Sequence, residues 1–144
     1  MTELEQNVKQ VLSTVNGRAT VLAATKTVAP ERINLIYDMG IHTIGENRVQ
    51  ELLEKYDALD KRFDIHFIGR LQRNKVKYII GKVSLIHSLD SVPLAEEIDR
   101  RSEAAGLVTS CLVEVNAGGE ESKGGITPEE LPSFIENISS FRHI

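Results

Sequence analysis

The stretch of this sequence that most clearly offers a reactive group is LAATKT, residues 22–27, in which an apolar run ends in a lone lysine. Such a run is typical of a strand buried on both faces, which would place Lys26 at the rim of a core. Desolvation there lowers the pKa of an ammonium and frees the neutral amine to act as a Schiff-base nucleophile. A strand-end lysine that simply reaches into solvent is the commoner arrangement, so these six residues alone establish no function.

Polar residues also follow the other apolar, strand-like segments, which is where sites form in parallel α/β folds. These residues are Glu46 and Asn47, Gly69 and Arg70, Ser88 and Asp90, and Asn116. Turns and helix caps collect the same residue types, so Asn47 could cap a helix or lie beside a ligand held on Lys26. His66 falls inside a strand, where a histidine with a satisfied hydrogen bond is the default interpretation.

Other candidate groups suggest no further chemistry. The histidines at 42, 87 and 143 have no metal-ligand spacing with one another or with Cys111, so no metal is predicted. Cys111 itself lies in an apolar run, which favours a buried, inert thiol. The glycine-rich stretch 118–125 could cradle an anion or form a surface loop, and it lacks the Walker A pattern.

Composition narrows the class of protein. The chain has 144 residues, of which 41% are hydrophobic, and this suits a globular domain with a real core. With 17 basic and 21 acidic residues it gives no argument for nucleic acid or anionic membranes as partners. A single cysteine, no secretory leader and no apolar run of membrane-spanning length together predict a cytoplasmic protein.

Hydrophobic periodicity predicts strands and helices in alternation. Strands are expected at about 20–24, 41–44, 64–68, 84–87 and 111–115, with a sixth beginning at 141–144. Helices are expected at about 2–15, 30–39, 49–56, 71–80, 92–105 and 127–138, the last with Pro132 just inside it.

This alternation indicates right-handed βαβ units and a parallel sheet, either a TIM-type (β/α) barrel or a doubly wound open sheet. No GxGxxG follows the first strand, which counts against a dinucleotide-binding open sheet. A complete eight-stranded barrel usually needs about 200 residues or more. We therefore expect residues 1–144 to form a single, incomplete barrel domain, truncated after about five βα units.

Five motifs in order carry a resemblance to a known family: LAATKT (22–27), IGENRVQE (44–51), HFIGRLQRNK (66–75), IHSLDS (86–91) and VEVNAGGEESKGGI (113–126). Together they resemble the YggS/PROSC family of pyridoxal phosphate homeostasis proteins over almost the whole chain. The resemblance implies a barrel of the alanine-racemase N-terminal type that binds pyridoxal 5′-phosphate.

The resemblance also implies roles for individual residues. Lys26 matches the lysine that forms the internal aldimine, Asn47 matches the asparagine beside the cofactor, and His66 matches a position near the pocket. Family members are regarded as non-catalytic carriers or regulators of the cofactor, and as monomers at full length. The chain lacks the family's GLM, SMGMSxD and VRIG segments, which supply the phosphate cradle, so its own competence to bind is in question.

Two other functions stay open. One is a fold-type-III pyridoxal phosphate enzyme such as an amino-acid racemase, which would need a second acid/base group that the sequence does not reveal. The other is a non-functional fragment of the carrier, which cooperative unfolding of the isolated chain would argue against.

Overall fold

The sheet of this protein is parallel throughout and follows the order of the sequence. The computed structural model describes all 144 residues, and its strands pair in the order β1-β2-β3-β4-β5. Their bounds are Leu22–Ala24, Thr43–Glu46, Asp64–Phe67, Leu85–Leu89 and Ser110–Val113. A doubly wound sheet would reverse its strand order part-way. Of the two predicted architectures, the sequential order therefore confirms the barrel type. The five strands form a partial barrel-like unit.

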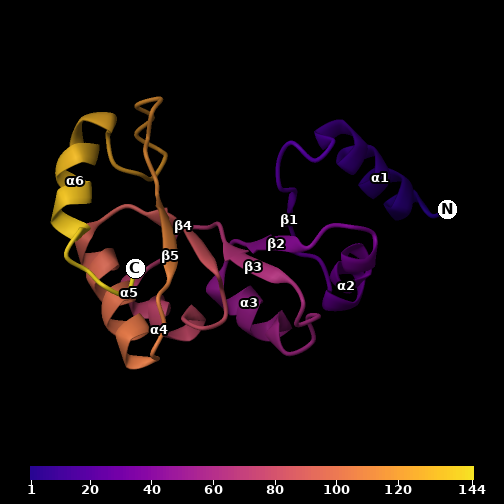
Figure 1. Ribbon diagram of the computed structural model, residues 1–144, viewed down its shortest axis with the longest axis horizontal. Helices are drawn as coiled ribbons and strands as arrows, with labels where there is room; N and C mark the ends of the chain where they lie inside the picture. The colour runs from indigo at the N-terminus through magenta and orange to yellow at the C-terminus, as the bar shows by residue number, and fades with distance from the viewer.

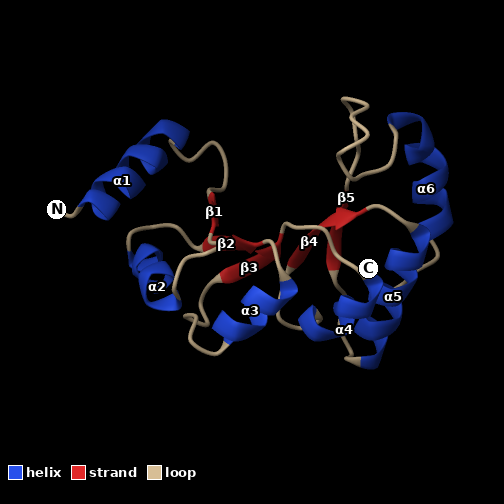
Figure 2. Ribbon diagram, turned by 180° about the vertical axis from the view of Figure 1, so that it is seen from behind, coloured by secondary structure: helices blue, strands red, loops and turns tan.

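Helices cover one face of the sheet and leave the other without helices. Figure 1 shows α2, α3, α4 and α5 below the strands, while α1 and α6 rise at the two ends above them. The reverse view in Figure 2 gives the same arrangement. The helix bounds are Glu3–Val15 (α1), Pro30–Asp38 (α2), Val49–Tyr56 (α3), Val76–Ile79 (α4), Val92–Ala104 (α5) and Leu131–Ile138 (α6). We call the side without helices the open face.

The hydrophobic core lies between the strands and the helices beneath them. Ile44, Phe67 and Ile86 point from neighbouring strands into this layer and are completely buried. Leu52 of α3 and Ile98 of α5 meet them from the helix side, and both are completely buried. Because strand side chains alternate between faces, the residues on either side of these core positions lie on the open face.

Two predicted helices are shorter than expected. The segment 71–80 forms a 3₁₀ turn, Arg73–Lys75, before the single α-turn of α4, and no side chain caps its start. The segment 127–138 likewise opens with a 3₁₀ turn, Pro128–Glu130, capped by the Thr127 hydroxyl. Pro132 cannot donate a backbone hydrogen bond, so the α-helix proper starts beside it at Leu131.

The sixth strand expected at 141–144 is wrong. This segment has no strand geometry, and its link to β5 is one hydrogen bond from the Thr109 N–H to the His143 carbonyl, 3.0 Å long. The second strand, expected at about 41–44, begins later than predicted, because strand pairing starts at Thr43. Ile41 is buried in the segment that leads to β2, but it is not paired in the sheet. No helix is both long enough and apolar enough to cross a membrane.

Candidate functional site

Lys26 sits on a four-residue turn, Thr25–Val28, at the carboxyl end of β1, which we call the Lys26 turn. The Val28 N–H closes it with a 3.1 Å hydrogen bond to the Thr25 carbonyl. Thr27, its third residue, has φ of +65°, a conformation that glycine usually supplies in such turns and that strains a β-branched residue. Lys26 is exposed and its side chain makes no hydrogen bond or ion pair, although its carbonyl accepts from the Thr27 hydroxyl at 2.6 Å. The desolvation that its sequence context suggested is therefore not seen.

A buried ionic cluster holds the Lys26 turn from behind. The Lys55 ammonium lies 2.8 Å from Glu46 Oε1 and 2.7 Å from Glu51 Oε1, and donates to the Thr25 carbonyl at 2.8 Å. Glu46 Oε1 also accepts from the Thr25 hydroxyl at 3.1 Å, and Glu51 Oε1 accepts from the Thr27 N–H. We call Glu46, Glu51 and Lys55 the Lys55 network.

Charge pairing keeps the Lys55 network ionised. Burial disfavours the charged form of Lys55, but its hydrogen bonds to Glu46 and Glu51 outweigh that effect and hold the pKa of Lys55 above its usual value. The same contact with Lys55 lowers the pKa of Glu51 below its usual value. Near neutral pH the Glu51 carboxylate and the Lys55 ammonium are therefore both charged.

Asn47 follows β2 and lies at the same edge of the sheet as Lys26. Ala24 pairs with Gly45, so Lys26 and Asn47 each follow a paired residue by two positions on neighbouring strands. Asn47 does not cap α3, since Arg48 is the N-cap residue and no side chain caps that helix. The Asn47 Oδ1 atom is buried and has no hydrogen-bond partner. The capping interpretation is thus wrong, and the amide oxygen has no hydrogen-bond partner within the protein.

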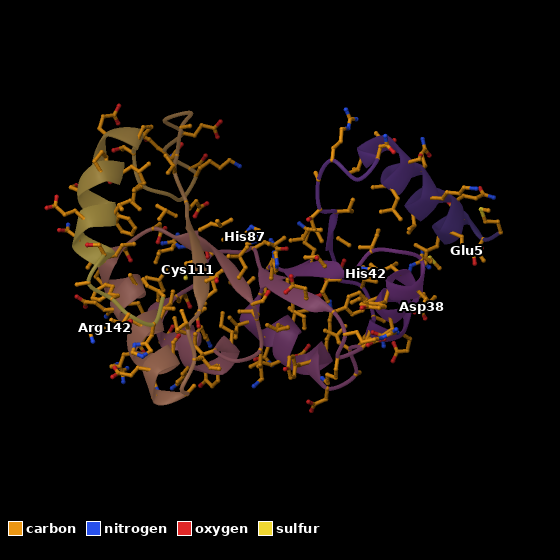
Figure 3. All side chains as sticks on the ribbon, in the orientation of Figure 1. Glu5, Asp38, His42, His87, Cys111 and Arg142 are labelled. Atoms are coloured by element: carbon orange, nitrogen blue, oxygen red, sulfur yellow. The ribbon has the colours of Figure 1, made fainter.

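His66 lies further from the carboxyl ends of the strands than Asn47, and its ring contacts His87 and Asp64. It pairs with Gly45 in the register, about 6.6 Å below the level of Asn47 along the strand direction. Its Nδ1 atom is 2.9 Å from His87 Nε2, and its Nε2 atom is 3.2 Å from Asp64 Oδ2. The other carboxylate oxygen of Asp64, Oδ1, accepts a hydrogen bond from the Ser84 hydroxyl. Figure 3 shows His87 on the open face, above the middle of the sheet.

The hydrogen bond between the two rings requires a proton on one of the facing nitrogens and a lone pair on the other. Burial, and then the charge of His66, lower the pKa of His87 below its ordinary 6.5. Sequence reasoning assigned His66 to a site but gave His87 no role, because residues 66 and 87 come together only through the register of β3 and β4.

The His87 shift predicts how stability depends on pH. As pH falls through about 6.5, His87 becomes protonated in the unfolded chain but stays neutral in the folded protein. The free energy of unfolding therefore falls. A His87→Gln variant should lose stability less steeply between neutral and mildly acidic pH, by up to about 1.4 kcal/mol per pH unit, the limit for one proton. Urea unfolding at a series of pH values measures this, and equal slopes in the two proteins would contradict it.

Cys111 and the glycine-rich stretch, two other features singled out in the sequence, show no sign of a site. Burial raises the pKa of the half-buried Cys111 thiol to about 12, so it stays protonated at neutral pH, in line with the inert thiol expected. Residues 117–124 are exposed, and the Asn116 side chain closes their loop through the Glu120 backbone. No three His, Cys, Asp or Glu side chains are grouped to hold a metal ion.

The family of the chain follows from a comparison with known domains. The family model "Alanine racemase, N-terminal domain" matches residues 1–144. The chain belongs to that family. It is also 56% identical over 119 residues to the pyridoxal phosphate homeostasis protein of Aquifex aeolicus, a match that covers 82% of this chain. The resemblance carried by the five motifs is therefore confirmed.

Solved structures place the fold in the same group. PipY from Synechococcus elongatus PCC7942, solved without pyridoxal phosphate, superposes with a TM-score of 0.91 at 26% identity, covering 98% of this chain and 66% of PipY. A second PipY structure has pyridoxal phosphate bound and gives a TM-score of 0.80. Alanine racemase from Clostridium difficile 630 matches at 15% identity with a TM-score of 0.75, covering 96% of this chain and 40% of the racemase, which shows the fold alone.

The matches extend over only part of each relative. The chain spans about half the length of the curated relatives it matches, 52% of the A. aeolicus protein and 54% of a Helicobacter pylori protein of the same name.

Proposed function

We propose that this chain binds pyridoxal 5′-phosphate as a Schiff base on Lys26 and serves the intracellular homeostasis of that cofactor. The observation that carries the proposal is the free Lys26 amine on a braced turn, beside the buried and unpartnered Asn47 amide oxygen. Support also comes from relatives named pyridoxal phosphate homeostasis proteins and from PipY, which has been solved with pyridoxal phosphate bound.

The residues at this edge of the sheet fit such a ligand. The neutral Lys26 amine adds to an aldehyde carbon, a C=N bond replaces C=O, and one water leaves. Asn47 Oδ1 is a buried acceptor without a partner within the protein, and a hydrogen-bond donor on a ligand that reaches it would satisfy it. When bound, the cofactor supplies an electron sink, and the protein supplies its placement.

We propose a role for His66 that is indirect. Both of its ring nitrogens are within hydrogen-bond distance of other side chains, His87 and Asp64. His66 would therefore line the approach to the ligand without a hydrogen bond to it. We assign no catalysis to the chain, because its curated relatives are named for homeostasis and the likeness to racemases is one of fold. A cytoplasmic location and a monomeric state stay predictions.

The proposal is tested by mixing the chain with pyridoxal phosphate and following the visible absorbance of the Schiff base. The band should form with the native chain and be lost in Lys26→Ala, while the exposed-lysine control Lys123→Ala keeps it. Borohydride reduction and peptide mapping should then place the label on residue 26. A native chain that forms no such band would refute cofactor binding, and turnover of alanine enantiomers by the loaded chain would refute the non-catalytic assignment.

A further inference from the structure

We propose that the Lys55 network is a positioning device for Lys26, with Glu51 as its central member. This inference rests on the proposed function, because it takes Lys26 as the residue to be placed. Glu51, Glu46 and Lys55 do not reach a ligand in this proposal. They act through the backbone on either side of Lys26.

The contacts fix the Lys26 turn at three points that bracket the lysine. Before Lys26, the Thr25 carbonyl accepts from the Lys55 ammonium at 2.8 Å, and the Thr25 hydroxyl donates to Glu46 at 3.1 Å. After Lys26, the Thr27 N–H donates to Glu51. Lys26 itself has no side-chain partner, so its direction depends on the backbone that these bonds hold.

Strain in the turn explains why it needs holding. Thr27 occupies φ of +65°, the left-handed region, in which a β-branched residue is strained. Its N–H belongs to the planar peptide group that joins Lys26 to Thr27, so the hydrogen bond to Glu51 fixes the orientation of that peptide directly after the Lys26 Cα. The charged acceptor is therefore well placed to stabilise the strained form.

Burial and charge make the network stiff. The side chains of Glu46 and Lys55 are 0% and 9% exposed and that of Glu51 is 20% exposed, so water competes little for their bonds. Glu51 and Lys55 are also one helical turn apart on α3, which ties the turn to the helix as one unit. Movement of Lys26 is thereby coupled to the placement of α3.

The first test needs no cofactor. Amide hydrogen exchange of Thr27 should be slow in the native chain and at least about tenfold faster in Glu51→Ala, because its acceptor is gone. Glu51→Gln keeps an acceptor oxygen and should retain most of the protection. Glu54→Ala is the matched control, since Glu54 carries the same charge on the same helix and bonds only Gln50. An unprotected Thr27 amide in the native chain would overturn the inference.

The second test uses pyridoxal phosphate and separates positioning from general stability. Glu51→Ala should weaken Schiff-base formation about tenfold, equivalent to about 1.4 kcal/mol, and reduce the induced circular dichroism per bound cofactor. Glu54→Ala should change neither. In a Thr27→Gly background, where the positive φ carries no strain, the effect of Glu51→Ala should shrink. An unchanged effect in that background would mean that Glu51 supports the fold and does not position Lys26.

The two proposals fail in different ways. Suppose the native chain forms no Schiff base at residue 26, while amide hydrogen exchange of Thr27 becomes faster in Glu51→Ala as described. The proposed function then fails, but the Lys55 network is still shown to hold the Lys26 turn. If the Schiff base forms equally well in Glu51→Ala and in the native chain, the positioning role fails and the proposed function stands.

Discussion

Replacing Lys55 by methionine is expected to lower the free energy of unfolding by about 3–5 kcal/mol, the range measured when one partner of a buried ion pair is removed. The loss is large because Glu46 is completely buried and has one carboxylate oxygen, Oε2, that already lacks a partner. Without Lys55 its charge would be uncompensated in the core. Chemical denaturation with urea, followed by far-UV circular dichroism, measures the change.

Two further variants show whether the stranded charge is the cause. Lys123→Met removes the same charge from an exposed loop and should change stability by no more than about 0.5 kcal/mol. Glu46→Gln combined with Lys55→Met removes both charges, so it should recover part of the loss, and a double-mutant cycle gives the coupling. Strict additivity of the two substitutions would show that the pair does not interact as its 2.8 Å contact implies.

Replacing Gly69 by alanine is expected to destabilise the protein by about 2–4 kcal/mol and to disturb the Asn47 edge of the sheet. An added Cβ at position 69 would lie 2.0 Å from the Asn47 carbonyl oxygen and 2.8 Å from the Asn47 Cα. Both are backbone atoms, so relief requires the ends of β2 and β3 to separate. That separation would break the 2.9 Å hydrogen bond from the Ile68 N–H to the Glu46 carbonyl.

Gly118→Ala is the matched control for this substitution. An added Cβ there meets nothing nearer than 3.8 Å, so its effect on the free energy of unfolding should stay within about 0.5 kcal/mol. A Gly69→Ala variant as stable as Gly118→Ala would show that the approach of the two backbones is looser than the structure has it. Loss of Schiff-base formation in Gly69→Ala alone would tie this approach to the placement of Asn47.

The sequence was sufficient to predict the alternation of strands and helices, because each βα unit carries its own periodicity and its own stop signal. Asn16, for example, ends α1 in the left-handed conformation, with φ of +50°. The sequence erred where local signals were weak. Phe141–Ile144 is apolar enough for a strand, but a strand requires a partner, and periodicity carries no information about partners.

The site was predictable only in part, for the same reason. Lys26 and Asn47 stand out because each directly follows an apolar strand, and the register puts both at one edge. The Lys55 network was missed. The spacing of Glu51 and Lys55 hints at an ion pair on a helix, but Glu46 joins them only because β2 packs against α3. The contact between His66 and His87 likewise depends on strand register.

The sequential strand order has a consequence for how the chain reaches this structure. Every strand pairs with the strand that follows it, and paired residues are about twenty positions apart along the chain. The β1–β2 pair needs nothing beyond Glu46 to begin forming, and α3 needs nothing beyond Tyr56. The Lys26 turn and the Lys55 network can therefore assemble during synthesis, while the residues of β4 and β5 are still being added at the ribosome.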